Sequence, residues 1–211
     1  MSCLTLNLSK PGESPAKLAL NLQKNEGFRV RLAWEGGCDL DLHALVCSNS
    51  GEGAKASSLG DVLSSYNVCR QLGGQTVGTL TPASDGSFSI HGGALRHSAD
   101  ARDGDQLEID EWITVQPACL PLPAKGHLEI PLIAMVHPQN GPLRFRDVRN
   151  ATVIVETDAG QALLRLALGQ DFGDFVGVQM GSVLVSEHGA EFAAIGVGFN
   201  GDFNAVLAHF S

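Results

Sequence analysis

The chain has 211 residues, of which 44% are hydrophobic and 18% are charged, so it can bury a sizeable core. Lysine and arginine number 14 against 23 aspartates and glutamates, and the formal net charge of -9 lacks the basic footprint of non-specific nucleic-acid binding. The sequence contains no run approaching the roughly 18 apolar residues of a membrane helix and no signal-peptide pattern at its start. With five scattered cysteines, these features predict a cytoplasmic protein with no nucleic-acid partner and no direct membrane insertion.

Short apolar or alternating runs, separated by turn residues, predict β-strands along the chain. In chain order they are residues 18–22, 28–34, 38–46, 86–91, 107–110, 129–136, 151–156, 161–168, 181–185 and 191–197. Residues 187–190 predict a hairpin turn between the last two. Helical periodicity is weak, and only residues 58–65 and 171–180 are candidates for a short helix. This pattern predicts an all-β fold, mainly β with one or two short helices, arranged as a sandwich or barrel.

Two aspartates, Asp39 and Asp41, lie one residue apart in an otherwise apolar run. On a strand their side chains project from one face about 6–7 Å apart, while Leu40 and Leu42 project from the other face into a core. Two like charges at that separation repel by about 2–3 kcal/mol at an effective dielectric constant of 20. A hard cation, an arginine or open solvent would each relieve this repulsion. Hydrogen bonds from backbone amides to strand-end aspartates are a further alternative to metal.

A second acidic cluster follows His97, where Asp100, Asp103 and Asp105 lie in a loop of small residues. Calcium takes six to eight oxygen ligands, and glycine lets such a loop supply backbone carbonyls beside its carboxylates. The acidic spacing is not that of an EF-hand. Taken alone, an Asp-Gly-Asp turn with solvated carboxylates is the simpler interpretation.

The remaining polar motifs do not indicate catalysis. His91 and His97 lie near acids, but seven histidines in 211 residues make such proximity common, so we do not predict a transition-metal site. Residues 73–78 are rich in glycine but lack the lysine of a phosphate-binding loop, and we interpret them as a turn. No serine lies in a nucleophile elbow, and no cysteine has a catalytic pattern. We therefore expect no enzymatic activity.

Seven segments, spread over nearly the whole chain, together have a recognisable order. They are Leu6–Gly12, Val30–Glu35, Asp39–Leu42, Tyr66–Asn67, Phe145–Ala151, Arg165–Phe172 and Glu191–Gly201. In this order they resemble the TerD family, which is named for tellurium resistance and grouped with bacterial stress-response proteins. Asp39–Leu42 is similar to the family's aspartate–leucine–aspartate signature. The densest match, Phe145–Ala151, is similar to its phenylalanine–glycine–glutamine–valine–arginine–asparagine–alanine block.

The resemblance implies that residues 1–211 form a single TerD-like domain, a two-sheet β-sandwich of TerD type. It also implies calcium bound between the aspartate–leucine–aspartate strand and the acidic loop. The carboxylate ligands would be Asp39, Asp41, Asp103 and Asp105, with Asp100 as an outer contributor. The implied role is non-enzymatic, in tellurite, phage or colicin resistance, with protein partners of a Ter-like system or self-assembly.

The chain departs from the family pattern at several acidic positions. Gly92–Ala94 stands where the family has a glycine and an aspartate, and Gly104 interrupts the consecutive acids of the loop. His137 and Pro138 follow Val136 where the family has an aspartate. Each lost carboxylate weakens calcium binding, so we expect one ion, weak binding or none.

The alternative is a metal-independent structural or assembly protein that reuses the TerD β-sandwich. The lost acids favour it, and the uncharged residues 112–120 would then be an assembly interface. An ordinary core strand with its exit loop explains those residues more simply. A strict monomer with a clear calcium response would favour the calcium-binding module instead.

Overall fold

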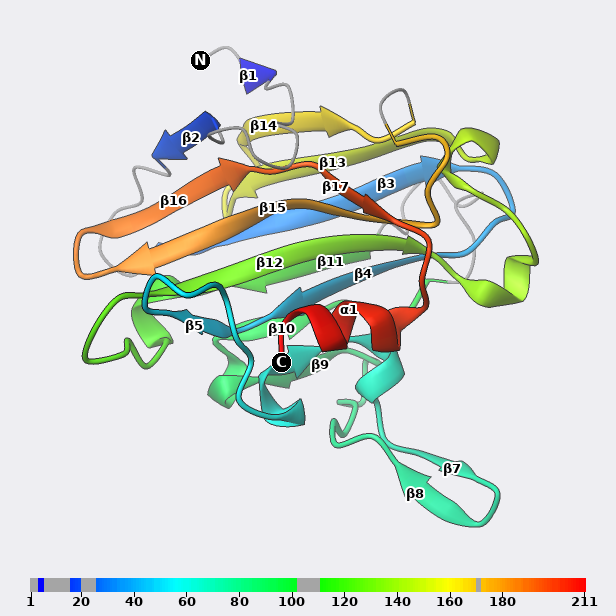
Figure 1. Cartoon of the computed structure of the whole chain (residues 1–211), viewed down its shortest axis with the longest axis horizontal. Coiled ribbons are helices and arrows are strands. Elements are labelled where there is room, and N and C mark those ends of the chain that lie inside the picture. The colour runs from blue at the N-terminus through cyan, green and yellow to red at the C-terminus, as the bar shows by residue number, and fades with distance from the viewer. Residues whose placement is uncertain (1–3, 6–15, 20–25, 102–110, 170–171) are drawn as a thin grey trace.

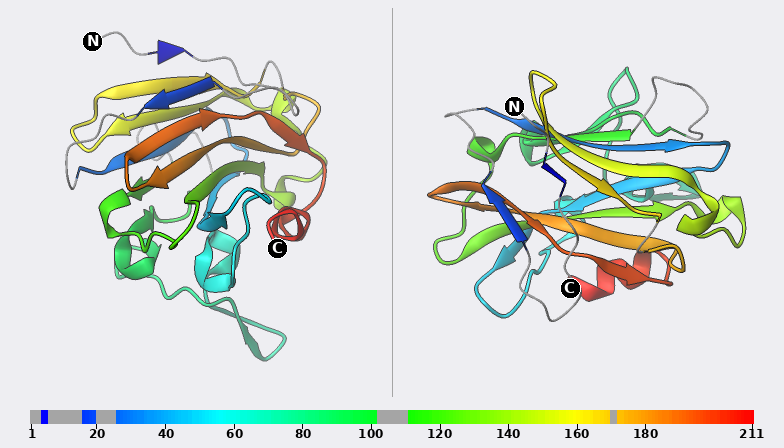
Figure 2. Two further views of the ribbon diagram at one scale, coloured as in Figure 1. Left: turned by 60° about the vertical axis from the view of Figure 1, so that its left-hand side comes forward. Right: turned by 90° about the horizontal axis from the view of Figure 1, so that it is seen from above.

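Two β-sheets pack face to face in the structure, a computed structural model that describes residues 4–5, 16–19, 26–101, 111–169 and 172–211 (Figures 1 and 2). One described sheet has seven strands, in the spatial order β1 (Leu4–Thr5), β14 (Ala162–Ala167), β13 (Arg149–Thr157), β3 (Phe28–Glu35), β11 (Glu111–Val115), β10 (Leu95–His97) and β9 (Phe88–Ile90). Apart from β1, which runs parallel to β14, its neighbours are antiparallel.

The other described sheet has eight antiparallel strands. Six follow the order β2 (Ala16–Ala19), β16 (Gly189–Ala194), β15 (Gly177–Ser186), β12 (His127–Val136), β4 (Leu40–Leu45) and β6 (Val62–Leu63). Two more, β5 (Cys47–Asn49) and β17 (Val197–Phe199), pair with β12 and β15 respectively. The predicted all-β, two-sheet sandwich is therefore confirmed.

The main core lies between the sheets because alternate strand residues point inward. Phe28, Val30 and Leu32 of β3 are fully buried there, while the residues between them are only half-buried. Leu40 and Leu42 of β4 enter the same core from the facing sheet, as the sequence predicts. Period-two patterning of this kind is what places one face of each sheet against the other.

The eight-stranded sheet is also covered on its outer face, by the C-terminal helix α1 (Phe203–His209; Figure 2). Phe203, Val206 and Phe210 pack in one apolar cluster with Leu45, Ile133 and Met135 of the sheet. Strand β4 is therefore buried on both faces along its whole length. A polar side chain on this strand lies away from water, whichever way it points.

The connections contain single turns of 3-10 helix and one isolated hairpin. The turns are η1 (Leu59–Asp61), η2 (Ser65–Asn67), η3 (His91–Gly93), η4 (Pro117–Cys119), η5 (Pro138–Asn140) and η6 (Phe145–Asp147). The hairpin, β7 (Arg70–Leu72) and β8 (Gln75–Val77), projects from the body of the molecule (Figure 1). Gly73 and Gly74 form its tip with φ of 58° and 82°, the positive values that a tight hairpin turn requires. Residues 73–78 thus contain the predicted turn.

Some sequence-predicted elements differ from the structure. Residues 171–180 do not form a helix in their described part, because Val178 and Met180 point into the core as part of β15. Residues 58–65 contain only η1, the short strand β6 and the start of η2. The strand predicted at residues 107–110 lies outside the described residues, and β11 begins at Glu111. The hairpin turn at residues 187–190 is confirmed between β15 and β16.

The helices in the described ranges include none that is both long and apolar enough to cross a membrane.

Candidate metal centre

The candidate site is built at the edge of β4, where its pairing with β6 ends. β12 pairs with β4 from Leu40 to Ala44, but β6 pairs only with Ala44 and Leu45 on the other side. The opposite sheet supplies side chains to the edge that is left open. The carboxylate of Glu111 accepts a hydrogen bond of 2.6 Å from the Leu42 amide, and His97 Nε2 lies 2.8 Å from the Leu42 carbonyl oxygen.

Glu111 is a fully buried acid on the core side of β11, in phase with the apolar residues Ile113 and Val115. Its second carboxylate oxygen accepts a 3.3 Å hydrogen bond from the Ala101 amide. Burial raises the pKa of Glu111 well above its usual value, and the nearby charge of Asp41 raises it further. The carboxylate is thus held between Leu42 and Ala101, but its ionisation costs free energy because the group is buried.

Asp41 projects from the face of β4 opposite to Leu40 and Leu42, and it is almost fully buried. Its two oxygens accept hydrogen bonds from the Ser65 hydroxyl at 2.9 Å and the Tyr66 hydroxyl at 3.0 Å. Burial raises the pKa of Asp41 to about 6, even though His137 and the two hydroxyls act to lower it. Near neutral pH this carboxylate therefore carries a charge that the fold stabilises poorly.

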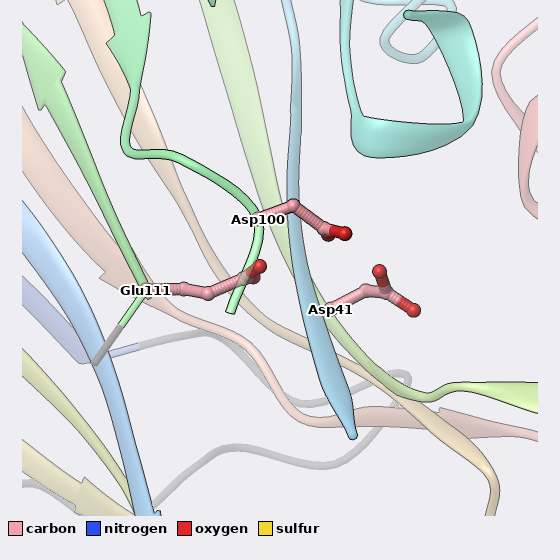
Figure 3. A group of neighbouring side chains, drawn as sticks. All are labelled: Asp41, Asp100 and Glu111. Atoms are coloured by element: carbon pink, nitrogen blue, oxygen red, sulfur yellow. The ribbon is translucent and has the colours of Figure 1, made fainter. Parts of the chain in front are cut away.

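Three carboxylates converge at this point, from β4, β11 and the loop after β10 (Figure 3). Asp41, Asp100 and Glu111 each offer an oxygen within 4.8 Å of the other two; Asp100 is exposed, whereas the other two are buried. Each ionised pair at that separation repels by about 3–4 kcal/mol at an effective dielectric constant of 20. Two ligands of one calcium ion, with bonds of about 2.3–2.6 Å, lie at most about 5 Å apart, so oxygens within 4.8 Å of one another are close enough to share an ion. The donor set, three carboxylates in reach of one ion, therefore fits the chemistry of calcium.

The sequence-predicted ligands are placed unequally by the structure. Asp41 and Asp100 lie in the three-carboxylate group, whereas Asp103 and Asp105 lie outside the described residues. Asp39 precedes β4 and is not in the group; its Oδ2 lies 3.8 Å from His137 Nδ1. The Asn140 side chain holds the Asp39 backbone through hydrogen bonds of 3.0 and 2.7 Å. The negative charge of Asp39 also contributes to the raised pKa of Asp41.

Glu111 is the member of the group that sequence reasoning missed. A usable signal was present, because Glu111 alternates in phase with Ile113 and Val115 and therefore occupies an inward position of a strand. A glutamate at such a position needs a partner or a cation, since a buried, unpaired charge is costly.

The two histidines of this region have other partners. His97 is fully buried, and its ring nitrogens lie 2.9 and 2.8 Å from the carbonyl oxygens of Ser98 and Leu42. With both ring nitrogens directed at backbone carbonyls, His97 helps to hold the β4 edge. His91 Nε2 lies 3.0 Å from Asp61 Oδ1.

The sequence model of the TerD domain matches residues 87–210 of this chain. The chain belongs to the TerD family. The matched residues include Asp100 and Glu111, while Asp41 lies before them, on a strand that occupies an interior position of the sandwich.

Two solved structures show that the TerD fold extends over most of the chain. One is a homologue of a telluride resistance protein (TerD), SCO6318 from Streptomyces coelicolor A3(2), with a TM-score of 0.61 and 17% identity over 87% of this chain and 96% of that one. The other is SAV2460, a protein of unknown function, with a TM-score of 0.61 and 14% identity over 88% of this chain and 96% of that one. A comparison with curated protein sequences finds no match.

The hydroxyl of Tyr66 is expected to stabilise the ionised form of Asp41. Tyr66→Phe should lower the free energy of unfolding by about 1.5–3 kcal/mol at pH 7, the usual contribution of a hydrogen bond to a charged group. The loss should be smaller at pH 5, because the pKa of Asp41 is about 6 and the carboxyl is then protonated. Urea unfolding at both pH values measures it. An equal loss at both would assign the effect to ring packing instead.

Proposed function

We propose that this TerD-family protein is a non-enzymatic binding module with a single weakened calcium site. The supporting observation is the convergence of the Asp41, Asp100 and Glu111 carboxylates within 4.8 Å, two of them buried. Repulsion among these charges favours any state that neutralises them, and a divalent cation does so without a proton. Asp39, Asp103 and Asp105 remain proposed as further ligands around this group.

The affinity is expected to be low. Both oxygens of Asp41 already accept hydroxyl hydrogen bonds, and the oxygens of Glu111 accept backbone amides, so calcium has to share or displace these donors. Three carboxylates are also few for an ion that takes six to eight oxygens. A dissociation constant of about 0.1–1 mM, the range of weak calcium modules, is the natural expectation.

The cellular role proposed for the protein follows from its family. TerD-family membership supports a part in stress responses of the tellurite, phage or colicin resistance type, and one structural neighbour is described as a homologue of a telluride resistance protein. The partners would then be proteins of a Ter-like system or further copies of the chain, in the cytoplasm. Residues 1–211 are proposed to form one domain, since β3 and β4, which precede the matched residues, occupy interior positions in the two sheets.

A metal-independent assembly role is the second candidate, and the electrostatics of the site favour it in one respect. Burial raises the pKa of both Asp41 and Glu111, so protons can neutralise the cluster instead of calcium. In that case the site is a buried polar network that only shapes the β4 edge.

Equilibrium dialysis of chelator-treated protein against millimolar calcium tests the proposal and separates the two candidates. We expect about one calcium retained per chain, with a tenfold excess of magnesium unable to displace it, because magnesium prefers shorter bonds and keeps its waters. Light scattering on the same samples reports the oligomeric state. No retained calcium together with a stable oligomer would replace the calcium module with the assembly protein.

A further inference from the structure

A small cavity, which we call the α1 cavity, lies between helix α1 and the outer face of the eight-stranded sheet, beside β17 (Figure 2). Its volume is about 160 Å³. The strand register builds its floor, because Ile133 of β12, Gln179 of β15 and Val197 of β17 are direct neighbours across the sheet. The other lining residues are Phe199, Ala205, Val206, His209 and Phe210.

The walls of the α1 cavity are held in place by the packing of the fold. Val206 and Phe210 are buried in the apolar cluster that joins α1 to the sheet, and Phe199 packs against that cluster. The Phe210 carbonyl oxygen also accepts a 2.8 Å hydrogen bond from the Ala56 amide, which fixes the end of the helix. Gly177 leaves room for the Phe199 ring, since a Cβ atom on this glycine would lie 2.2 Å from it. The cavity is therefore formed before any ligand arrives.

The lining of the α1 cavity is apolar apart from two residues, Gln179 and His209. Ala205 and His209 are exposed, so the cavity opens to solvent beside the helix. Gln179, in contrast, is only 8% exposed and lies on the floor. None of these lining residues carries a fixed charge. An apolar lining with one buried polar group is typical of a site for a neutral small molecule.

The side-chain amide of Gln179 is held in one orientation by its neighbours. The amide lies 3.1 Å from Ser182 Oγ, and Ser182 donates to the Glu129 carboxylate at 2.7 Å. A serine hydroxyl has a single hydrogen, which is used here on Glu129, so Ser182 accepts its second bond from the Gln179 amide nitrogen. The Gln179 carbonyl oxygen then receives no hydrogen bond from the described residues. A buried acceptor without a donor costs free energy, and a ligand that donates a hydrogen bond would remove this cost.

The volume of the α1 cavity limits the size of the ligand. In another protein, a cavity of about 150 Å³ lined by leucine, isoleucine and phenylalanine side chains binds benzene. The α1 cavity is of similar size and is lined by two phenylalanines, Phe199 and Phe210, together with aliphatic side chains. A single aromatic ring that carries one hydrogen-bond donor therefore matches both the space and the Gln179 carbonyl oxygen.

We propose that the α1 cavity binds a small, neutral aromatic alcohol of about the size of phenol. Its ring lies among the apolar side chains, and its hydroxyl donates to the Gln179 carbonyl oxygen. A carboxylate or phosphate group fits less well, because it would meet no fixed positive charge among the lining residues. This binding is independent of the proposed calcium site, since Asp41, Asp100 and Glu111 do not line the cavity.

Isothermal titration calorimetry with phenol and with toluene, in the presence of chelator, tests the proposal. We expect one phenol per chain, with a dissociation constant of about 1 mM for so small a ligand. Gln179→Met removes the acceptor but keeps the length of the side chain. It should weaken phenol binding about threefold to tenfold, the range of one neutral hydrogen bond, without weakening toluene binding. The matched control is Gln75→Met, at an exposed glutamine of β8, which should bind both molecules like the wild type.

A second pair of variants tests where the ligand binds. Ala205→Phe adds a ring at an exposed lining position and should weaken the binding of both molecules at least about tenfold, because the new side chain fills the cavity. Ala208→Phe, at an exposed position of α1 that does not line the cavity, is its control and should bind like the wild type. Melting temperatures show whether both helix variants stay folded, and Gln179→Met decides the case if Ala205→Phe does not.

Several results would overturn the proposal. One is no phenol binding to the wild type at concentrations well above the expected dissociation constant. Equal losses of phenol and toluene affinity in Gln179→Met would leave Gln179 with a packing role only. Unchanged binding in a folded Ala205→Phe protein would place the ligand elsewhere. Self-association of the wild type, measured by light scattering and abolished by Ala205→Phe, would assign the cavity to a side chain of a second copy of the chain.

Discussion

Calcium added to chelator-treated protein at pH 7, at about one hundred times its dissociation constant, should raise the melting temperature by about 5–10 °C. A ligand that binds only the folded state stabilises it by about 2.7 kcal/mol at one hundred times its dissociation constant. In a chain of this size, each kcal/mol moves the melting temperature by about 2–4 °C. Differential scanning calorimetry at rising calcium concentrations measures the shift.

Substitutions in the three-carboxylate group test whether it is the source of that shift in melting temperature. Asp41→Asn and Glu111→Gln each remove one charge while preserving side-chain size, and each should abolish most of the calcium response. Asp39→Ala combined with Asp41→Ala should abolish it as well. Asp174→Asn, at an exposed aspartate that pairs with Arg146, is the control and should respond like the wild type. An unchanged response in Asp41→Asn would place any bound calcium elsewhere.

Without calcium, Asp41→Asn should make the protein more stable, by up to about 3 kcal/mol at pH 7. The pKa of Asp41 rises from 3.8 to about 6 on folding, chiefly because the carboxyl is buried, and each pKa unit corresponds to about 1.36 kcal/mol. Between these two values the folded chain keeps a proton that the unfolded chain has lost. Stability therefore falls as the pH rises through this window, and the full penalty is present above pH 6.

Asparagine has no charge to bury, so the gain in the free energy of unfolding from Asp41→Asn should be small at pH 4 and complete near pH 7. Urea unfolding of both proteins in chelator, at several pH values, measures the difference. The comparison with wild type is needed because His43 and His97 act in the opposite direction: burial lowers both of their pKa values, so their contribution destabilises the fold as the pH falls below 6.5. An Asp41→Asn protein that is less stable than wild type at pH 7 would mean that the fold stabilises this charge.

A variant that stabilises the calcium-free fold and removes the calcium response would indicate a site kept for binding at the expense of stability. The balance is sensitive because Tyr66, which bonds Asp41, also stacks on Phe203 of α1, with ring centres 5.3 Å apart. The fully buried His43 ring packs on Phe203 as well, at 4.5 Å. Tyr66 therefore links the Asp41 carboxylate to the ring of Phe203, which packs the C-terminal helix against the sheet.

Local patterning explains which parts of the fold could be predicted. The alternation in Phe28–Trp34 gives both the strand β3 and its inward face, and the turn residues after Ser186 give the last hairpin. Helix α1 was missed because it has only seven residues, too few for a helical period to stand out. Its Asp202 cap, which accepts a hydrogen bond from the Ala205 amide, and its apolar contacts with β4 and β12 stabilise it in the fold. Residues 171–180 are a candidate for a short helix in the sequence because their apolar alternation is weak: Gly177 and the polar Gln179 interrupt the apolar pattern of β15.

The candidate site was only half predictable for a similar reason. Asp41 and Asp100 lie in recognisable acidic motifs, but their meeting with Glu111 depends on how two sheets are stacked, which no local pattern specifies. Ser65 and Tyr66 reach Asp41 from η2 across more than twenty residues of chain. Such contacts follow from topology, so the sequence indicates the acids but not the hydroxyls that bind them.

The most direct test of the calcium site is a crystal structure of the protein grown with millimolar calcium. The ion should lie among the Asp41, Asp100 and Glu111 carboxylates, with oxygen ligands at about 2.3–2.6 Å. Calcium bound elsewhere on the protein would contradict the proposal. So would a structure in which these three carboxylates lie together with no ion between them, at a calcium concentration well above the expected dissociation constant.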